Sequence, residues 1–363
     1  MAPSDRIRLV VLFGGRSAEH EVSCVSALHV LRAVDPTRYD VEPIGITREG
    51  RWVESSEAVA ALGSGASALP SPDNSRGDEV DPLPAVMADG NAPVVVLPLL
   101  HGPMGEDGTV QGMLELAGIP YVGAGVLASA LCMDKAAAKD VLASHGLPQA
   151  RWLSARDVDV DDDFLHRVGT ELGWPVFVKP SNLGSSVGVS KVADAAALGP
   201  AVDVALRYDE YVVVEEAVVG REIECAVLGN EDPRASVPGE VVPSHEFYDY
   251  EDKYVDGQAG LLVPAPLPDA VADEVRRLAV AAYRALRVDG MARVDFFYEE
   301  QGRGLLVNEL NTIPGFTPIS MYPKLWEASG ISYDKLVDEL VSLALDRHAR
   351  RQRFATGREA LPE

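Results

Sequence analysis

A lysine and a run of glycine and serine residues lie between two apolar stretches near the middle of the chain. Residues 177–189 read Phe-Val-Lys-Pro-Ser-Asn-Leu-Gly-Ser-Ser-Val-Gly-Val, which predicts a buried strand ending at Lys179, a loop and a second strand. Small residues let the backbone N–H groups of such a loop close on a phosphate, and Lys179 supplies a positive charge beside it. The segment lacks the Gly-Lys-Ser/Thr of a Walker A loop, and a strand rather than a helix follows it. A glycine-rich hairpin with a solvent-exposed lysine is the alternative that these residues alone leave open.

Carboxylates gather in a second segment, near the C-terminal end of the chain. Residues 290–311 predict a hairpin whose two strands are joined by Glu-Glu-Gln-Gly-Arg. Side chains alternate between the faces of a strand, so Arg293 and Asp295 share a face. Glu309 and Asn311 also share one, and pairing about the turn places Asp295 opposite Glu309. Oxygen-only ligands of this kind suit Mg²⁺ or Mn²⁺ rather than zinc. The alternative, an exposed polar face, is disfavoured by flanking apolar residues, namely Phe296, Leu306, Val307 and Leu310.

Further polar residues follow two strands of the N-terminal part. The apolar run 7–13 predicts a buried parallel strand that a Gly-Gly turn leads into a helix. Glu19 falls in the first helical turn, where it either complements the helix dipole or binds a ligand. Residues 94–100 predict another buried strand, which ends in a polar loop, and open α/β sheets bind ligands at such strand ends. His101 and Glu106 either organise this loop or take part in chemistry.

A helix predicted for residues 128–145 carries two lysines one turn apart, Lys135 and Lys139. Solvent exposure is the default interpretation for both. The preceding residues 123–128 look like part of a dinucleotide-binding fingerprint. Their strand is short, contains Pro120 and is not followed by a strand that ends in an acidic residue, so we reject that interpretation.

The remaining elements position these residues. Further strands are predicted at residues 39–46, 211–214 and 220–228, and further helices at 157–172, 269–286 and 334–350. Residues 55–92 are rich in Ser, Gly, Pro, Asp and Ala and predict a surface excursion with one short helix. The segment 244–254 mixes aromatic and charged residues before several glycines, which fits a mobile lid better than a core element.

Composition restricts the class of protein. A chain of 363 residues suggests two to three domains, and 47% hydrophobic with 24% charged residues is typical of a soluble globular protein. The net charge of −24 argues against nucleic acid or an anionic membrane as a partner, although a nucleotide needs only a local cationic pocket. Cys24, Cys132 and Cys225 are too scattered for a metal site and indicate reduced thiols in a cytoplasmic protein. The apolar N-terminal run is too short to span a membrane.

In their order along the chain these motifs resemble those of the ATP-grasp superfamily and, within it, the D-alanine–D-alanine ligase family. The resemblance spans nearly the whole chain except the excursion. Its segments are Phe-Gly-Gly-Arg-Ser-Ala-Glu-His-Glu-Val-Ser at 13–23, His-Gly-Pro-Met-Gly-Glu-Asp-Gly-Thr-Val-Gln-Gly-Met-Leu-Glu at 101–115, Met-Asp-Lys at 133–135, the Lys179 hairpin, Phe-Tyr-Asp-Tyr-Glu-Asp-Lys-Tyr at 247–254 and Asn-Glu-Leu-Asn-Thr-Ile-Pro-Gly at 308–315.

The resemblance implies a mixed α/β, ATP-grasp fold with three domains. The domains would be a Rossmann-like N-terminal domain at 1–125, a central ATP-grasp subdomain at 126–220 and a C-terminal ATP-grasp subdomain at 221–350 with the lid at 244–262. A tail would follow at 351–363. It also implies ATP-dependent ligation of two D-alanines through a D-alanyl phosphate, with release of ADP and phosphate, for peptidoglycan synthesis. We therefore expect ATP, D-alanine, two Mg²⁺ or Mn²⁺ ions, compatibility with a monovalent cation, and a cytoplasmic homodimer.

The resemblance also implies roles for single residues. Glu19 would hold the ammonium of the first D-alanine, and Ser185 and Tyr254 would join it in closing the lid. Arg293 and the Gly315 N–H would face the developing oxyanion. His101 belongs with the substrate residues, and Ser320 with Met321 would receive the second D-alanine. The metal ligands would be Asp295, Glu309 and Asn311.

The remaining implied roles concern ATP. Phosphates would contact Lys135, Lys179 and Ser186, adenine would contact Glu215, Glu216, Ala217 and Val218, the ribose would contact Glu222, and Phe247 with Lys253 would cover the nucleotide from the lid. Some relatives carry lysine where this chain has Glu216, which puts a side-chain role at that position in doubt.

Three alternatives remain at this point. A D-alanine–D-lactate ligase is the nearest, although Tyr254 in the lid favours an amine acceptor. A binding module without turnover would be expected to have lost one of Asp295, Glu309 and Asn311, all of which are present. An oxidoreductase would depend on the glycine fingerprint rejected above.

Overall fold

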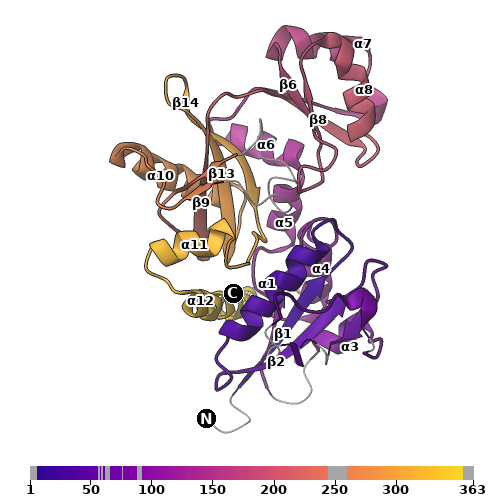
Figure 1. Cartoon of the computed structure of the whole chain (residues 1–363), viewed down its shortest axis with the longest axis vertical. Helices are drawn as coiled ribbons and strands as arrows, with labels where there is room; N and C mark the ends of the chain where they lie inside the picture. Colours follow the sequence, from indigo (N-terminus) through magenta and orange to yellow (C-terminus); the bar gives the residue numbers. More distant parts are fainter. Residues whose placement is uncertain are drawn as a thin grey trace, which may run out of the picture.

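The computed structural model describes residues 6–55, 58, 60–61, 66–75, 77–87, 92–243 and 260–354. The predicted lid residues Phe247, Lys253 and Tyr254 lie outside the described residues. The described chain forms three β-sheets with helices packed on them (Figure 1). Each sheet lies within one of the three predicted domain ranges, and the boundaries at residues 125 and 220 stay predictions.

The first sheet is mainly parallel and belongs to the N-terminal part. Its order is β3-β2-β1-β4, formed by β1 (Ile7–Gly14), β2 (Tyr39–Ile46), β3 (Trp52–Glu54) and β4 (Val94–Pro98). Strands β2 and β4 flank β1 in parallel, as the continuous apolar run in β1 predicts. Helices of this part are α1 (His20–Ala33), α3 (Pro82–Val86) and α4 (Thr109–Ala117). The excursion packs against this part, since Leu69, Pro72 and Val86 are buried.

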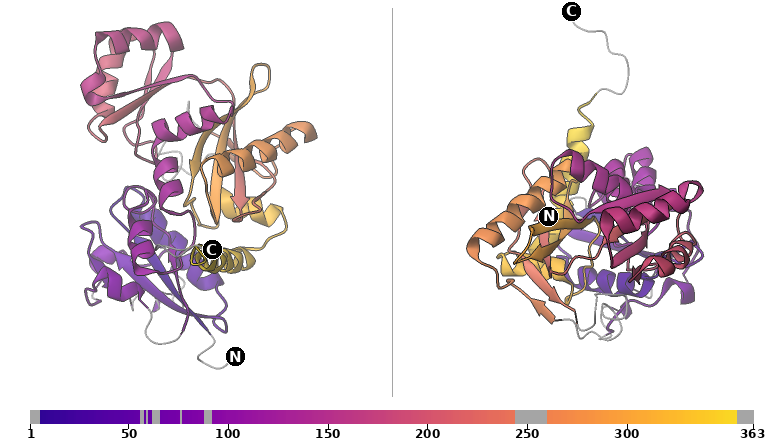
Figure 2. Two further views of the ribbon diagram at one scale, coloured as in Figure 1. Left: turned by 180° about the vertical axis from the view of Figure 1, so that it is seen from behind. Right: turned by 90° about the horizontal axis from the view of Figure 1, so that it is seen from above.

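The second sheet is antiparallel and carries the Lys179 hairpin. Its order is β5-β8-β6-β7, formed by β5 (Trp152–Arg156), β6 (Val176–Pro180), β7 (Ser190–Val192) and β8 (Tyr211–Glu216). Helices α7 (Asp162–Arg167) and α8 (Ala195–Ala205) share its core, together with short helical turns at Asp157–Asp159 and Val168–Leu172. This unit stands at the end of the molecule farthest from the first sheet, as Figures 1 and 2 show from opposite sides.

The third sheet is antiparallel and contains the acidic hairpin. Its main order is β12-β11-β9-β13-β14, with β10 paired to β9. The strands are β9 (Arg221–Leu228), β10 (Arg234–Ala235), β11 (Gly239–Val242), β12 (Gly260–Leu262), β13 (Met291–Glu299) and β14 (Gly304–Asn311). The helix α10 (Asp269–Ala285) buries its apolar stripe against this sheet, as its periodicity predicts. A short helix at Pro72–Asn74 lies in the excursion.

The single helix predicted for residues 128–145 is wrong, because two helices stand there: α5 (Val126–Met133) and α6 (Lys135–Ser144). Asp134 separates them and caps α6, accepting a hydrogen bond from the Ala137 N–H at 3.0 Å and from the Ser181 hydroxyl at 2.7 Å. The cap satisfies a backbone donor that the first turn of a helix leaves unpaired. The break places Lys135 at the first position of α6.

Packing also ties the ends of the chain together. Helices α5 and α6 share a core with the third sheet, although they fall in the predicted central range. Helix α12 (Tyr333–Arg351) returns to the first sheet beside α1 (Figure 1). Its buried Arg347 donates to the carbonyls of Gly123 and Tyr121. Helix α12 therefore packs the C-terminal part of the chain against the first sheet.

Candidate active site

One cavity of about 1570 Å³ collects the described residues that the sequence nominates. It is lined by the second and third sheets, by α1 and the loop after β4 in the N-terminal part, and by other loops and helices. The nominated residues on its wall are Glu19, His101, Lys135, Lys179, Ser185, Ser186, Glu215, Glu216, Ala217, Val218, Glu222, Arg293, Asp295, Glu309, Asn311, Gly315, Ser320 and Met321. Their convergence is a property of the fold, while their individual roles stay predictions.

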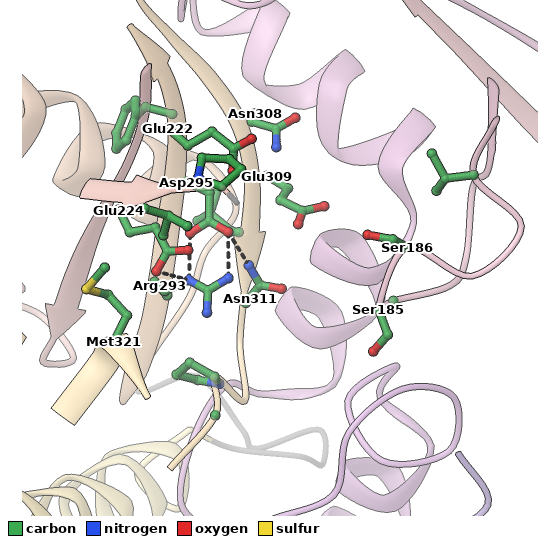
Figure 3. Close-up of a pocket in the computed structure, with 18 of the residues that line it drawn as sticks. Ser185, Ser186, Glu222, Glu224, Arg293, Asp295, Asn308, Glu309, Asn311 and Met321 are labelled. Carbon is green, nitrogen blue, oxygen red and sulfur yellow. Dashed lines mark hydrogen bonds and ion pairs between the residues drawn. The ribbon is translucent and has the colours of Figure 1, made fainter. Parts of the chain in front are cut away.

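The acidic hairpin has the predicted register. Asp295 on β13 pairs with Glu309 on β14, and Arg293 pairs with Asn311. Arg293 donates from Nε and Nη2 to the two carboxylate oxygens of Asp295, each at 2.7 Å, and Asn311 Nδ2 donates to Asp295 Oδ2 at 2.9 Å (Figure 3). A bidentate arginine–carboxylate pair of this kind is strong and fixes both side chains.

The neighbouring strand adds a carboxylate that sequence reasoning missed. Glu224 on β9 lies opposite Asp295 on β13, is buried, and approaches Arg293 Nε at 3.1 Å. Burial lowers the pKa of the Arg293 guanidinium, but the charges of Asp295 and Glu224 outweigh it and raise that pKa well above its ordinary value. Period-two spacing from Glu222 along β9 was the signal that could have identified it.

The donor set on this hairpin suits a divalent cation. Two carboxylates and an amide oxygen on adjacent strands are the hard ligands that Mg²⁺ or Mn²⁺ prefers. Within the part of the chain that the structure describes, no group of three His, Cys, Asp or Glu side chains is arranged for a metal ion. The predicted set therefore depends on the amide oxygen of Asn311 as its third donor.

Across the cavity, the loop between β6 and β7 has an unusual backbone. Ser185 and Ser186 have φ of 56° and 57°, a left-handed conformation that residues other than glycine rarely adopt. The buried Ser185 Oγ has no hydrogen-bond partner among the described residues. Lys135 Nζ donates to the Leu183 carbonyl at 2.5 Å and holds the loop in place. Strain and an unpaired buried hydroxyl are typical of a ligand-binding loop.

The lysine at position 139 is a second residue that sequence reasoning missed. The interpretation of Lys139 as solvent-exposed is wrong, since it is 2% exposed and lies 3.1 Å from Glu215 Oε1. Lys179 Nζ donates to Glu215 Oε2 at 2.8 Å. Burial alone would raise the pKa of Glu215, but the two lysines outweigh it and lower that pKa to about 2. Nothing local in the sequence links α6 to the end of β8.

Glu19 and the polar loop after β4 line the other end of the cavity. Glu19 precedes α1 and makes no side-chain capping hydrogen bond there. His101 is buried, with Nδ1 3.1 Å from the Ile313 carbonyl, and its Nε2 has no hydrogen-bond partner in the described structure. Glu106 accepts the Gly102 N–H at 2.8 Å. Burial and the nearby charge of Glu19 raise the pKa of Glu106 to about 8.

Helix α1 places two apolar side chains on the cavity rather than in the core. Val22 and Val25 are half-buried and line the cavity rather than the core. The core face instead uses small and polar residues as well as leucines, namely His20, Ser23, Cys24, Ala27, Leu28 and Leu31. Hydrophobic periodicity does not distinguish a face that packs on a sheet from one that lines a ligand cavity.

The start of α11 (Met321–Ala328) closes the remaining side of the cavity. Ser320 Oγ lies 2.7 Å from Thr317 Oγ1 and accepts the Thr317 N–H at 3.1 Å. A Cβ at position 315 would lie 2.8 Å from Ser320 Oγ, so Gly315 leaves room for this turn. No helix in the described ranges is long and apolar enough to cross a membrane.

Two segments of the chain match known families. Residues 8–124 match the D-ala D-ala ligase N-terminus, and residues 141–342 match the D-ala D-ala ligase C-terminus. D-alanine–D-alanine ligases from Caldicellulosiruptor bescii and Halothermothrix orenii are 46% identical over 364 residues and 47% identical over 344 residues. These alignments cover 98% and 94% of this chain, respectively, and 99% of each relative.

Solved structures agree over similar lengths. A D-alanine–D-alanine ligase from Coxiella burnetii gives a TM-score of 0.80 at 36% identity, covering 96% of this chain and 97% of its own. A D-Ala:D-Ser ligase from Enterococcus faecalis gives a TM-score of 0.78 at 34% identity, covering 93% and 99%. The ATP-grasp fold expected from the sequence is thereby confirmed. The chain belongs to the D-alanine–D-alanine ligase family.

Proposed function

We propose that this protein joins two D-alanine molecules into D-alanyl-D-alanine at the expense of ATP, as a step in making peptidoglycan precursors. The observation that carries the proposal is the convergence of the serine loop, two lysines (Lys135 and Lys179) and the acidic hairpin on one cavity. A carboxylate substrate must approach a triphosphate there, and both are anionic. Positive charge from the protein and from bound cations is what permits that approach.

Nucleotide binding is assigned to the second sheet and its loop. Lys135 and Lys179 would neutralise the phosphates, and the loop containing Ser186 would close on them through its backbone N–H groups. Adenine would lie against the connection that runs from Glu215 to Val218. Glu222, at the start of β9, would take the ribose hydroxyls. All of these residues line the cavity.

The acidic hairpin would hold the divalent cations through Asp295, Glu309 and Asn311. Bound there, such ions supply Lewis-acid stabilisation of the charge that develops on the phosphoryl oxygens. Because Asp295 is already held by Arg293, the hairpin keeps its geometry without help from a ligand. We propose two ions, Mg²⁺ or Mn²⁺, on this surface.

The amino-acid substrates would occupy the opposite end of the cavity. Glu19 would bind the ammonium of the first D-alanine, with His101 beside it. Arg293 and the Gly315 N–H would donate to the oxyanion that forms when the second amine attacks, and such a donor typically contributes about 3–4 kcal/mol. Ser320 and Met321 would receive the second carboxylate. Since an acyl phosphate hydrolyses in water, a closing lid with Tyr254 hydrogen-bonded to Ser185 is part of the proposal.

Finer properties complete the proposal. We infer a D-alanyl phosphate intermediate, a homodimer in the cytoplasm, and a three-domain division at residues 125 and 220. Phe247 and Lys253 would cover the nucleotide from the lid. These properties rest on membership of the family rather than on contacts in the described residues.

The test measures phosphate release with ATP, Mg²⁺ and D-alanine, and identifies the product by mass spectrometry. Phosphate and D-alanyl-D-alanine should appear together. With L-alanine in place of D-alanine, neither phosphate nor a dipeptide should appear. D-serine and D-lactate, each offered with D-alanine, test acceptor choice. Ester formation exceeding dipeptide formation would move the assignment to a D-alanine–D-lactate ligase, and ATP hydrolysis without D-alanine would contradict ligation.

A further inference from the structure

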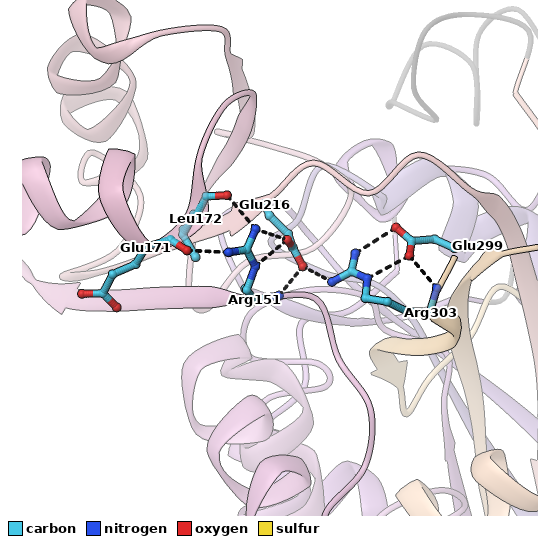
Figure 4. Close-up of polar contacts among 6 residues, drawn as sticks. All are labelled: Arg151, Glu171, Leu172, Glu216, Glu299 and Arg303. Carbon is cyan, nitrogen blue, oxygen red and sulfur yellow. Dashed lines mark hydrogen bonds and ion pairs between the residues drawn. The ribbon is translucent and has the colours of Figure 1, made fainter. Parts of the chain in front are cut away.

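The carboxylate of Glu216 forms ion pairs with arginines from two parts of the molecule, the second sheet and the third. Glu216 ends β8 of the second sheet and is 9% exposed. Figure 4 shows it between Arg151, from the second sheet, and Arg303, from the turn between β13 and β14 of the third. A carboxylate shared by two guanidinium groups holds both in a fixed relation.

At the second sheet, Arg151 donates hydrogen bonds to Glu216 and to two backbone carbonyls. Its Nε donates to Glu216 Oε2 at 2.8 Å, and its backbone N–H donates to Glu216 Oε1 at 2.7 Å. Its other nitrogens donate to the carbonyls of Glu171 and Leu172, at 2.7 and 2.9 Å, where the helical turn Val168–Leu172 ends. A cation at a helix C-terminus is favourable. Arg151 thus attaches Glu216 to the helical layer as well as to the sheet.

At the third sheet, Arg303 is oriented by Glu299 at the end of β13. Its Nε and Nη2 donate to the two carboxylate oxygens of Glu299, both at 2.8 Å. This leaves Nη1 pointing at Glu216 Oε1, to which it donates. The arrangement forms a continuous chain from Glu299 through Arg303 and Glu216 to Arg151.

This series of ion pairs bridges the connection formed by residues 217–220. The connection carries the backbone from β8 to β9 and lines the cavity. The Ala217 N–H donates to the Pro175 carbonyl at 3.0 Å. At the other end, a Cβ at Gly220 would lie 2.8 Å from the Tyr298 carbonyl, so the connection there runs at backbone distance from β13. Both ends of the connection are fixed, and the Glu216–Arg303 contact fixes the distance between the sheets that they belong to.

Charge keeps this contact formed at neutral pH. Burial would raise the pKa of Glu216, but the Arg151 N–H and the guanidinium groups of Arg303 and Arg151 lower it overall. Arg303 also holds the pKa of Glu299 at about 2. The carboxylate of Glu216 is therefore paired with two arginines, Arg151 and Arg303.

We infer that Arg303 is a positioning residue for the nucleotide: through Glu216 it fixes the connection 217–220, so that the base meets a preformed surface. A surface ordered before binding loses less entropy when the ligand arrives, which strengthens affinity without a new contact. The inference rests on the proposed function, because that proposal assigns adenine to this connection. Arg303 itself need not touch the nucleotide.

The test compares ligands with and without a base. In Arg303→Ala, the KM for ATP and the Kd for ADP should rise about three- to tenfold, a modest range because Arg303 is partly exposed. Inhibition by tripolyphosphate, which lacks a base, should be unchanged, and so should the KM for D-alanine. Arg303→Lys keeps the charge, but a lysine cannot form a bidentate pair with Glu299 and reach Glu216 at the same time. Its Kd for ADP should therefore be intermediate.

The matched control is Arg277→Ala on α10, which removes an exposed ion pair with Glu274 far along the chain from the connection. It should leave ADP binding unchanged. If Arg303→Ala binds ADP as the wild type does, or weakens tripolyphosphate equally, the inference is overturned. A lower melting temperature with unchanged ADP binding would also overturn it, since the network would then be structural only.

Two further outcomes separate this inference from the proposed function. If the wild type binds neither ADP nor ATP, the proposed function fails and the inference with it. If the wild type binds both nucleotides and the Arg303 variants bind them equally well, the inference fails while the proposed function stands. Should Arg303→Ala fail to give a cooperative melting transition, Arg303→Lys carries the same comparison, and an unchanged Kd for ADP there would overturn the inference.

Discussion

The two walls of the cavity carry opposite arrangements of charge. On the wall formed by the third sheet, carboxylates surround one arginine: Glu224, Asp295 and Glu309 act on Arg293. On the wall formed by the second sheet and α6, lysines surround one glutamate: Lys135, Lys139 and Lys179 act on Glu215. Each wall neutralises part of its own charge and keeps an excess of one sign.

The sign of the excess charge on each wall determines which part of a ligand that wall can bind. The acidic wall suits a cation and the lysine wall suits phosphates, so a metal-bound triphosphate complements both. On the lysine wall, burial and the nearby Lys179 lower the pKa of Lys135. Lys179, paired directly with Glu215, has its pKa raised despite its burial. Binding of phosphate would relieve the crowding at Lys135.

The largest expected effect comes from breaking the acidic wall. Glu309→Gln or Asp295→Asn should reduce turnover by about a thousandfold or more, since a loss of about 4 kcal/mol in transition-state stabilisation corresponds to that factor. The melting temperature of Glu309→Gln should change little, because Arg293 keeps both Asp295 and Glu224 as partners. Steady-state rates at saturating Mg²⁺ check this. Near-normal rates in either variant would show that the hairpin does not bind the metal.

Breaking the lysine wall should instead affect stability first. Lys139→Met leaves Glu215 buried with one fewer cation, and removing one partner of a buried ion pair typically costs about 3–5 kcal/mol. Chemical denaturation of this variant measures the cost, with Lys335→Met, at an exposed lysine on α12, as the control. A free energy of unfolding within about 0.5 kcal/mol of the wild type, the usual range for surface changes, would mean that Lys139 contributes no more than an exposed lysine.

The two walls also differ in how far the sequence predicts them. The acidic wall lies on one hairpin, where alternation and a short turn fix the register, so the pairing of Asp295 with Glu309 could be predicted. The lysine wall joins α6 to the end of β8, and no local pattern connects Lys139 with Glu215. The break at Asp134 likewise depends on Ser181 from a distant loop. Contacts within an element follow from its period, whereas contacts between elements require the fold.

A smaller effect should come from the strained loop of the lysine wall. Ser186→Gly removes a left-handed serine at φ 57°, and glycine adopts this conformation without strain, so the protein should gain up to about 1 kcal/mol of stability. Ser185→Gly should gain similarly but lose activity if the Ser185 hydroxyl links to the lid. Melting temperatures and rates measured together separate the two. Equal activity losses in both variants would point to loop geometry rather than to the hydroxyl.

An effect on the pH dependence of stability concerns Glu106, whose charge interacts with Lys135 of one wall and Glu309 of the other. Its pKa is raised from about 4.5 to about 8, first by burial and then by Glu19. Between these pH values the folded protein keeps the proton and the unfolded chain has lost it. Stability should therefore be complete below pH 4.5 and fall as the pH rises toward 8.

Replacing Glu106 tests that sign directly, because glutamine does not ionise and still offers an oxygen to the Gly102 N–H. The stability gained by Glu106→Gln over the wild type should grow from pH 5 to pH 8 and then level off, as denaturation at several pH values would show. Glu327→Gln, at an exposed carboxylate on α11, should show no such trend. In a Glu19→Gln background the gain should level off at a lower pH, since a negative neighbour that raises the pKa of Glu106 is removed. A gain that is constant with pH would mean that Lys135 balances the negative groups and that Glu106 is ionised between the two walls.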